Sequence, residues 1–234
     1  MQHHHLALEL VCVHLNHQLR GTDAEEDEAF VRQQAEIRGL TFASERLSVA
    51  AHAAESKLSL ETAARLCRIE RLTALARRYG CTTIATGHHL NDNVETVLFR
   101  LLRGTGYRGL AGIHPLRNGP AGLRWIRPLL NLTRQEIQTH LHKQGFAWRE
   151  DRTNRHTSIK RNYIRHRLLP HLEETATVPL APLVADLADA AYRMQRRVEC
   201  SIDSLWADHT VQGPQGETTL CIGCEPLRNA PPWL

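Results

Sequence analysis

Residues 86–112 read TGHHLNDNVETVLFRLLRGTGYRGLAG, and this stretch decides the predicted fold. The residues just before it, Thr82–Ala85, form a short β-branched and apolar run that is typical of a strand. Inside the stretch, apolar side chains recur at helical spacing at Val94, Leu98, Leu101 and Leu102. We expect a helix that is capped by Asn91 or Asp92 and ended by Gly104. The stretch therefore predicts a strand that leads directly into a helix.

Polar side chains gather at the start of this helix. Asp92 and Glu95 are three positions apart, so both project from the same side of the first turn, beside His88 and His89. Open α/β sheets usually bind their ligands where a strand ends and a helix begins. Two acids and an imidazole there are suited to hold Mg²⁺, to orient a phosphate-bearing cofactor or to move a proton. The same acids are equally compatible with a simple favourable interaction with the helix dipole.

The rest of the first 175 residues alternates between strand and helix patterns. We expect strands in residues 6–15, 40–47 and 82–86, and helices in residues 22–38, 60–79 and 133–144. This alternation predicts an α/β domain over residues 1–175, with a parallel sheet and helices on both of its faces. Pro179–Pro182 is predicted to be a linker, and residues 183–234 the start of a helical module.

Composition narrows the possible classes of protein. The chain has 234 residues, of which 42% are hydrophobic and 23% are charged, as in ordinary globular proteins. No apolar run approaches the roughly 18–20 residues that cross a bilayer, and no signal peptide is visible, so we expect a cytoplasmic protein without membrane contact. The six cysteines are therefore expected to be thiols. Cys221 and Cys224 form a single Cys-x-x-Cys pair, for which a zinc or redox role stays open but disfavoured.

Positive charge is concentrated in the middle of the chain. Residues 100–167 contain 15 Lys and Arg but only three acids, a net charge of +12. The other residues contain 14 basic and 22 acidic side chains, a net charge of −8. A basic section of this kind favours a polyanionic partner such as a nucleic acid, although a solvated surface is the simpler alternative.

Several segments together resemble the tRNA(Ile)-lysidine synthetases, a family of PP-loop ATP pyrophosphatases. Thr86–Thr96 is similar to that family's T-[AG]-H-H-x-x-D-Q-x-E-T, with Asn93 in place of the usual Gln. Arg103–Gly106 and Gly109–Ile113 resemble its R-G-[TS]-G and G-L-x-G-[MF] elements. The resemblance extends over about 150 residues, through the segments Val13–Gly21, Leu60–Arg68, Pro128–Ile137, Trp148–Asn154 and Lys160–Pro170.

The resemblance implies a ligase that uses ATP and Mg²⁺. In that family ATP adenylates the C2 oxygen of the wobble cytidine of tRNA(Ile) with a CAU anticodon, and free L-lysine then displaces AMP. It implies catalytic roles for His88, Asp92 and Glu95, with Asp92 also as a metal ligand. It implies cofactor binding by Arg65, Arg68, His14 and Asn16, and tRNA binding by Arg103, Arg161, Asn162 and Arg165. A homodimer is a candidate assembly.

One family element has no counterpart in this sequence. The S-G-G-x-D-S phosphate loop that follows the family's first strand is absent, so we expect an incomplete domain with exposed sheet edges and low stability. Two alternatives therefore stay open beside lysidine synthesis. One is tRNA 2-thiolation by an enzyme of the same superfamily, and the other is an RNA-binding remnant without ATP turnover.

Overall fold

The computed structural model describes residues 8–17, 22–149, 160–212 and 218–220. The chain divides into two compact units, one of residues 1–86 with 116–126 and the other of residues 87–115 with 127–234. Within the described ranges, no helix is long and apolar enough to cross a membrane. The predicted domain limits, residues 1–175 and 183–234, stay predictions.

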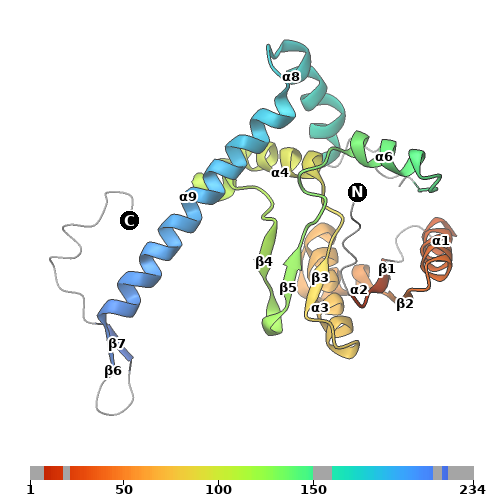
Figure 1. The fold of residues 1–234 in the computed structure, drawn as a ribbon, viewed down its shortest axis with the longest axis horizontal. Coiled ribbons are helices and arrows are strands. Elements are labelled where there is room, and N and C mark those ends of the chain that lie inside the picture. Colours follow the sequence, from red (N-terminus) through yellow and green to blue (C-terminus); the bar gives the residue numbers. More distant parts are fainter. Residues whose placement is uncertain (1–7, 18–21, 150–159, 213–217, 221–234) are drawn as a thin grey trace. The chain divides into compact units, whose positions relative to one another are not determined.

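The first unit contains a parallel pair of strands that is covered by helices on both faces (Figure 1). Strands β1 (Val11–Asn16) and β2 (Thr41–Arg46) are joined by helix α1 (Thr22–Ile37), which lies over one face. Helices α2 (Val49–Ser56) and α3 (Leu60–Arg78) cover the other face, where Leu15 of β1 packs against a buried cluster of Leu47, Val49, Ala53 and Ala63. The predicted α/β class is therefore confirmed for this pair.

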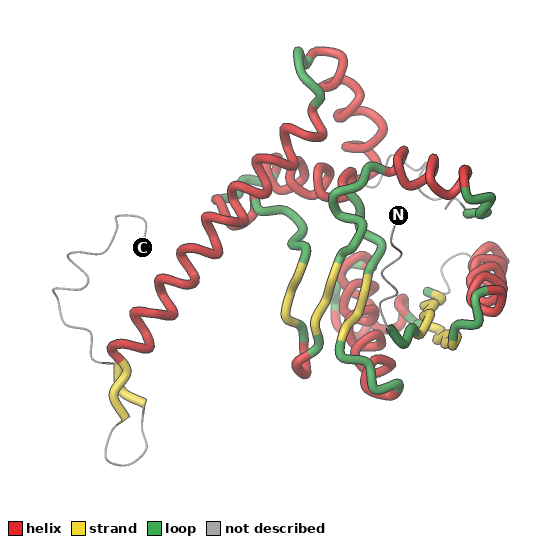
Figure 2. Tube along the Cα trace, in the orientation of Figure 1, coloured by secondary structure: helices red, strands yellow, loops and turns green. Residues whose placement is uncertain are grey.

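A second sheet in the same unit has three strands, and Figure 2 shows them side by side. Strand β5 (Arg124–Ile126) lies between β3 (Thr83–Ala85), with which it is parallel, and β4 (Leu116–Asn118), with which it is antiparallel. The hairpin between β4 and β5 contains the short helix η1 (Pro120–Gly122). Gly119 is required just before it, because an added Cβ would lie 2.2 Å from Nε1 of the buried Trp125.

Helix α3 contacts both sheets, although no strand in the described ranges connects them. Its first half contributes Ala63 to the cluster under β1, and its last turns contribute Ala76 to a cluster with Ile84 of β3 and Trp125 of β5. Among the described strands, β1 pairs only with β2 and β3 pairs only with β5. Within the described residues, the strands of the predicted α/β fold thus form two hydrogen-bonded pieces that share one supporting helix.

The second unit is mainly helical. Its elements are α4 (Leu90–Leu102), α5 (Tyr107–Leu110), α6 (Arg134–Lys143), α7 (Lys160–Tyr163), the π-helix η3 (Ile164–Leu168), α8 (Leu169–Thr175), α9 (Leu180–His209) and the hairpin β6 (Thr210–Gln212) and β7 (Thr218–Leu220). Helix α6 begins at the predicted capping box, in which Glu136 N donates to Thr133 Oγ1 and Thr133 N donates to Glu136 Oε2. Within the predicted linker at 179–182, α9 begins at residue 180, and Pro179 precedes it.

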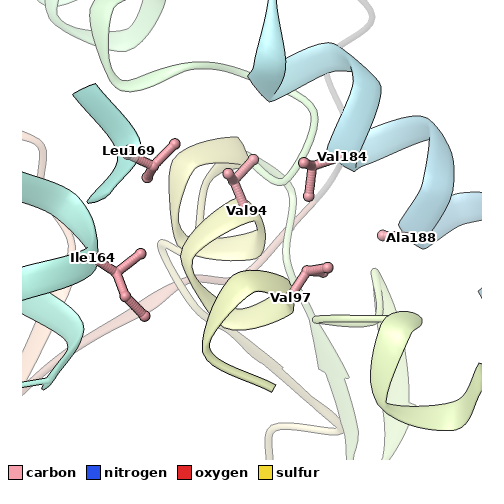
Figure 3. Packing of buried hydrophobic residues seen from close by; sticks show 6 residues of the cluster. All are labelled: Val94, Val97, Ile164, Leu169, Val184 and Ala188. Atoms are coloured by element: carbon pink, nitrogen blue, oxygen red, sulfur yellow. The ribbon is translucent and has the colours of Figure 1, made fainter. Parts of the chain in front are cut away.

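Helix α4 lies at the centre of the core of this unit (Figure 3). Val94 and Val97 of α4 are almost fully buried, between Ile164 and Leu169 on one side and Val184 and Ala188 of α9 on the other. Of the predicted apolar stripe, Val94 is buried and Leu98 packs against this core, whereas Leu101 and Leu102 are exposed. The core also fixes the orientation of the first turn of α4, which carries the predicted site residues.

Removing two methyl groups from the centre of this core tests how much the core contributes to the free energy of unfolding. We expect Val97→Ala to lower the free energy of unfolding by about 2–3 kcal/mol, from lost burial and the cavity left behind. The matched control is Leu102→Ala on the same helix, where the side chain is 65% exposed and the cost should stay within about 0.5 kcal/mol. Urea unfolding of the chain measures both, and equal effects would contradict the assigned core.

Candidate active site at the start of α4

The first turn of α4 is held by its own polar side chains and by the segment before α6. His89 is the N-cap, so the prediction of a cap at Asn91 or Asp92 is wrong. Asp92 is three residues inside, where its Oδ2 accepts a hydrogen bond from the backbone N–H of His89 at 3.0 Å. Asn91 Oδ1 accepts from the backbone N–H of Arg134 at 2.9 Å, which ties the start of α6 to the start of α4. Asp92 thus holds the first turn of α4 from within, and Asn91 holds it against α6.

The two predicted catalytic acids meet a cation from a distant part of the chain. Arg165 donates from Nε to Glu95 Oε1 at 2.6 Å and from Nη2 to Glu95 Oε2 at 3.0 Å, a bidentate pair. Its Nη2 also lies 3.6 Å from Asp92 Oδ1. Burial alone would lower the pKa of the Arg165 guanidinium, but the hydrogen bonds and charge of Glu95, together with the charge of Asp92, raise it. The structure therefore brings Asp92, Glu95 and Arg165 into one charged cluster.

A π-helix places Arg165 within reach of these acids. Residues 164–168 form η3, in which the backbone N–H of Leu169 donates to the carbonyl of Ile164, five residues earlier. Pro170 follows, and because its ring nitrogen carries no hydrogen, it cannot make the bond that would continue a regular α-helix there. π-helical turns of this kind are rare and often occur at functional sites.

The two acids differ in what they offer a ligand. The side chain of Glu95 is 4% exposed and both of its oxygens are bound by Arg165, whereas the side chain of Asp92 is 25% exposed. The described residues contain no group of three or more His, Cys, Asp or Glu side chains that is placed to hold a metal ion. Mg²⁺ binds in many enzymes through one or two carboxylates together with water and substrate phosphates, and Asp92 fits one such position.

The glycine-rich loop after α4 is fixed from the helix itself. Arg100 Nη1 donates to the carbonyls of Gly109 and Gly112, both at 2.9 Å, and Asn93 Oδ1 accepts from the backbone N–H of Ile113 at 2.7 Å. Gly112 has a φ of +61°, and an added Cβ would lie 2.1 Å from Asn93 Oδ1. Asn93, where the resemblance expects Gln, is therefore a structural residue, and sequence reasoning missed the role of Arg100.

The residues predicted to bind tRNA have different surroundings. Arg103 is exposed at the end of α4, with its guanidinium 5.3 Å from the centre of the Phe99 ring. Arg161 lies in α7, but its side chain is outside the described part of the structure. Asn162 is buried, and Arg165 is the cation of the acidic cluster. His88, predicted to be catalytic, is half-buried just before the N-cap of α4. The functional roles of all five stay predictions.

The residues predicted to bind the cofactor lie in the first unit. Asn16, the last residue of β1, is 3% exposed and donates from Nδ2 to the Ala24 carbonyl at 3.4 Å. Arg65 and Arg68 are exposed on α3, and Arg68 Nη2 lies 3.5 Å from His17 Nε2. Cations on an exposed helix suit a phosphate chain, so their surroundings fit the ATP role that the resemblance implies.

Known proteins related to this chain were found by sequence and by structure. Residues 1–172 match the family model of the PP-loop domain. The tRNA(Ile)-lysidine synthase of Geobacter sulfurreducens is 42% identical over 197 residues, which is 83% of this chain and 41% of the relative. The synthase of Chlorobaculum tepidum is 39% identical over 84% of this chain and 58% of the relative, and that of Bacillus subtilis is 34% identical over 70% and 35%. The chain thus spans about half or less of the length of these relatives.

A solved structure shares the fold at low sequence identity. The U34-tRNA thiolase NcsA of Methanococcus maripaludis, with its [4Fe-4S] cluster, superposes with a TM-score of 0.64 at 14% identity. The match covers 91% of this chain and 69% of the thiolase chain. At this identity the likeness shows the fold alone, and it agrees with the PP-loop match. The chain is therefore a member of the PP-loop family, with tRNA(Ile)-lysidine synthases among its relatives.

Proposed function

We propose that the protein is a tRNA(Ile)-lysidine synthetase, which uses ATP to attach L-lysine to C2 of the wobble cytidine in tRNA(Ile) with a CAU anticodon. This modification changes decoding from AUG to AUA. The observation that carries the proposal is the 34–42% identity to lysidine synthases over 70–84% of the chain. The charged cluster of Asp92, Glu95 and Arg165 at the start of α4 supports it, because two of its members lie in the motif shared with that family.

The proposed reaction has two steps. The C2 carbonyl oxygen of cytidine attacks the α-phosphorus of ATP, and pyrophosphate leaves with the bonding electron pair. An amine of lysine then attacks C2, AMP leaves with the C2 oxygen, and the amine loses a proton. A carbonyl oxygen is a poor leaving group before adenylation, and the departing pyrophosphate needs positive charge close to it.

The different surroundings of Asp92 and Glu95 suggest different roles for the two acids. Because Arg165 binds both oxygens of Glu95, Glu95 acts mainly through Arg165, and the more exposed Asp92 is the carboxylate that meets a substrate cation. That cation is Mg²⁺ or the ammonium group of lysine. We assign His88 to the reacting nucleotide, and Arg65 and Arg68, with His14 and Asn16, to ATP. The basic section of residues 100–167 neutralises tRNA phosphates.

Replacing Asp92 by Asn tests its direct role in the reaction. We expect Asp92→Asn to lower the rate of lysine incorporation into tRNA(Ile) by at least about 100-fold, because the charge that meets the substrate cation is lost. An amide oxygen can still accept the hydrogen bond from His89 N, so the melting temperature should change little. Incorporation of labelled lysine by the full-length gene product measures the effect. A rate near that of the unmodified enzyme would refute the assignment.

Glu95 should differ from Asp92 in its effect on stability. Glu95→Gln leaves a partly buried guanidinium without its main counter-charge, and Arg165→Met leaves a buried carboxylate, so each should cost about 3 kcal/mol of unfolding free energy. The double variant should cost clearly less than the sum of the two. Additive costs in urea unfolding would mean that the pair does not couple in solution.

The basic section can be tested through the salt dependence of tRNA binding. We expect Arg103→Ala to weaken tRNA binding. The magnitude of the slope of the logarithm of the binding constant against the logarithm of the salt concentration should fall by about 1, as for the loss of one phosphate contact. Arg77→Ala is the matched control, because Arg77 is an exposed arginine on α3 outside the basic section. Equal slopes for the two variants would contradict the assigned surface.

The fold likeness to a tRNA thiolase favours one second candidate, sulfur transfer to tRNA. Both reactions consume ATP on tRNA, so release of AMP does not separate them. Mass analysis of the nucleosides after reaction does, because one product contains lysine and the other contains sulfur. Binding of tRNA without any release of AMP would instead support an RNA-binding remnant.

A further inference from the structure

Glu28 is a half-buried acid in the middle of α1 that the proposed chemistry does not use. Its Oε1 accepts hydrogen bonds from Ser44 Oγ at 2.8 Å and from Arg32 Nη2 at 3.2 Å, and its Oε2 accepts from Asn16 Nδ2 at 3.5 Å. The side chain is only 16% exposed. One carboxylate thus connects α1 to the last residue of β1 and to Ser44 in β2.

The register of the two strands explains how Glu28 reaches them. His14 lies opposite Ser44, and Asn16 lies opposite Arg46, in the parallel pairing of β1 and β2. Side chains alternate between the two faces of a strand, so His14, Asn16 and Ser44 share the face that α1 covers. Ligands of open parallel sheets bind beyond the carboxyl ends of the strands, which is where Asn16 is placed.

The contacts of Glu28 fix the groups around it. A carboxylate accepts hydrogen bonds only from the NH₂ end of an amide, so Glu28 and the Ala24 carbonyl together determine which end of the Asn16 side chain faces them. The hydrogen bond from Ser44 is the main cause of a lowered pKa of Glu28, and the nearby His14 acts in the same direction. The acid is therefore ionised at neutral pH and accepts these hydrogen bonds as a carboxylate.

We infer that Glu28 is a positioning residue, which orients the Asn16 amide at the carboxyl end of β1 for contact with the nucleotide. The inference rests on the proposed function, since it takes that end of β1 to be part of the ATP site. The rival explanation is that Glu28 only attaches α1 to the sheet, as Arg32 does by lying 4.5 Å from the centre of the Phe42 ring.

Steady-state kinetics of the full-length enzyme separate the two explanations. We expect Glu28→Gln to raise the KM for ATP about tenfold while kcat stays within about twofold. The change displaces a side chain that contacts ATP, but it leaves the groups that take part in the reaction in place. In an Asn16→Ala background the same change should raise KM by less than about twofold, since the residue through which Glu28 acts is gone. Glu25→Gln is the matched control, an exposed acid on the same helix whose partner Arg46 lies 3.8 Å away, and it should leave KM unchanged.

A second measurement does not need activity. In NMR spectra of the chain, Glu28→Gln should shift the side-chain amide resonances of Asn16, whereas Glu25→Gln should leave them unchanged. If Glu28→Gln fails to fold, Ser44→Ala keeps the carboxylate but removes one of its hydrogen bonds, and a smaller rise in the KM for ATP is expected. A lower melting temperature with unchanged KM and unchanged Asn16 amide resonances would overturn the inference in favour of simple attachment. If the unmodified enzyme makes no lysidine, the proposed function fails, and the Asn16 amide resonances still decide whether Glu28 holds that amide.

Discussion

The bidentate pair between Arg165 and Glu95 is the interaction on which the described site depends. It joins two elements that are 70 residues apart in the sequence, α4 and the π-helix η3. Burying two charges is unfavourable unless each is well paired, and here the geometry satisfies both oxygens of Glu95. The core around Val94 and Val97 holds the same two elements together through apolar contact. Packing and charge therefore specify the same arrangement of the first turn of α4.

The first unit depends on a different constraint. Helix α3 contributes to two separate buried clusters, one below β1 and β2 and one beside β3 and β5. Because no described strand links the two sheets, this helix carries much of the contact between them within the unit. On the opposite face of β1 and β2, Glu28 of α1 accepts hydrogen bonds from Ser44 and Asn16, so charge contributes to that contact.

Local patterns in the sequence predicted much of the fold and part of the site. The spacing of Val94, Leu98 and Leu102 predicted α4, and the Thr133–Glu136 pair predicted the start of α6. The placing of Asp92 and Glu95 on one side of the first turn was also correct. What sequence reasoning missed depends on contacts between distant residues. Nothing local shows that Arg165 lies against Glu95, or that Glu28, one acid among several in α1, is the one that meets both strands.

The neighbours of each strand could not be predicted for a related reason. An alternation of strands and helices shows that parallel strands exist, but it does not show which strands become neighbours. The cap of α4 was misplaced by two or three residues because Asn91 and Asp92 are both good capping residues, and the structure uses each for another bond. Helix ends are often uncertain by this margin.

The π-helix makes the length of its segment as important as its composition. An α-helix advances by about 100° per residue, so removing one residue between Ile164 and Leu168 would turn every side chain on one side of the cut away from its partner by that angle. Either Arg165 would leave Glu95, or Leu169 would leave the core around α4. Conservative substitutions in this segment are therefore far easier to accommodate than a change in residue number. Its length should accordingly vary less among related chains than the identity of its exposed residues.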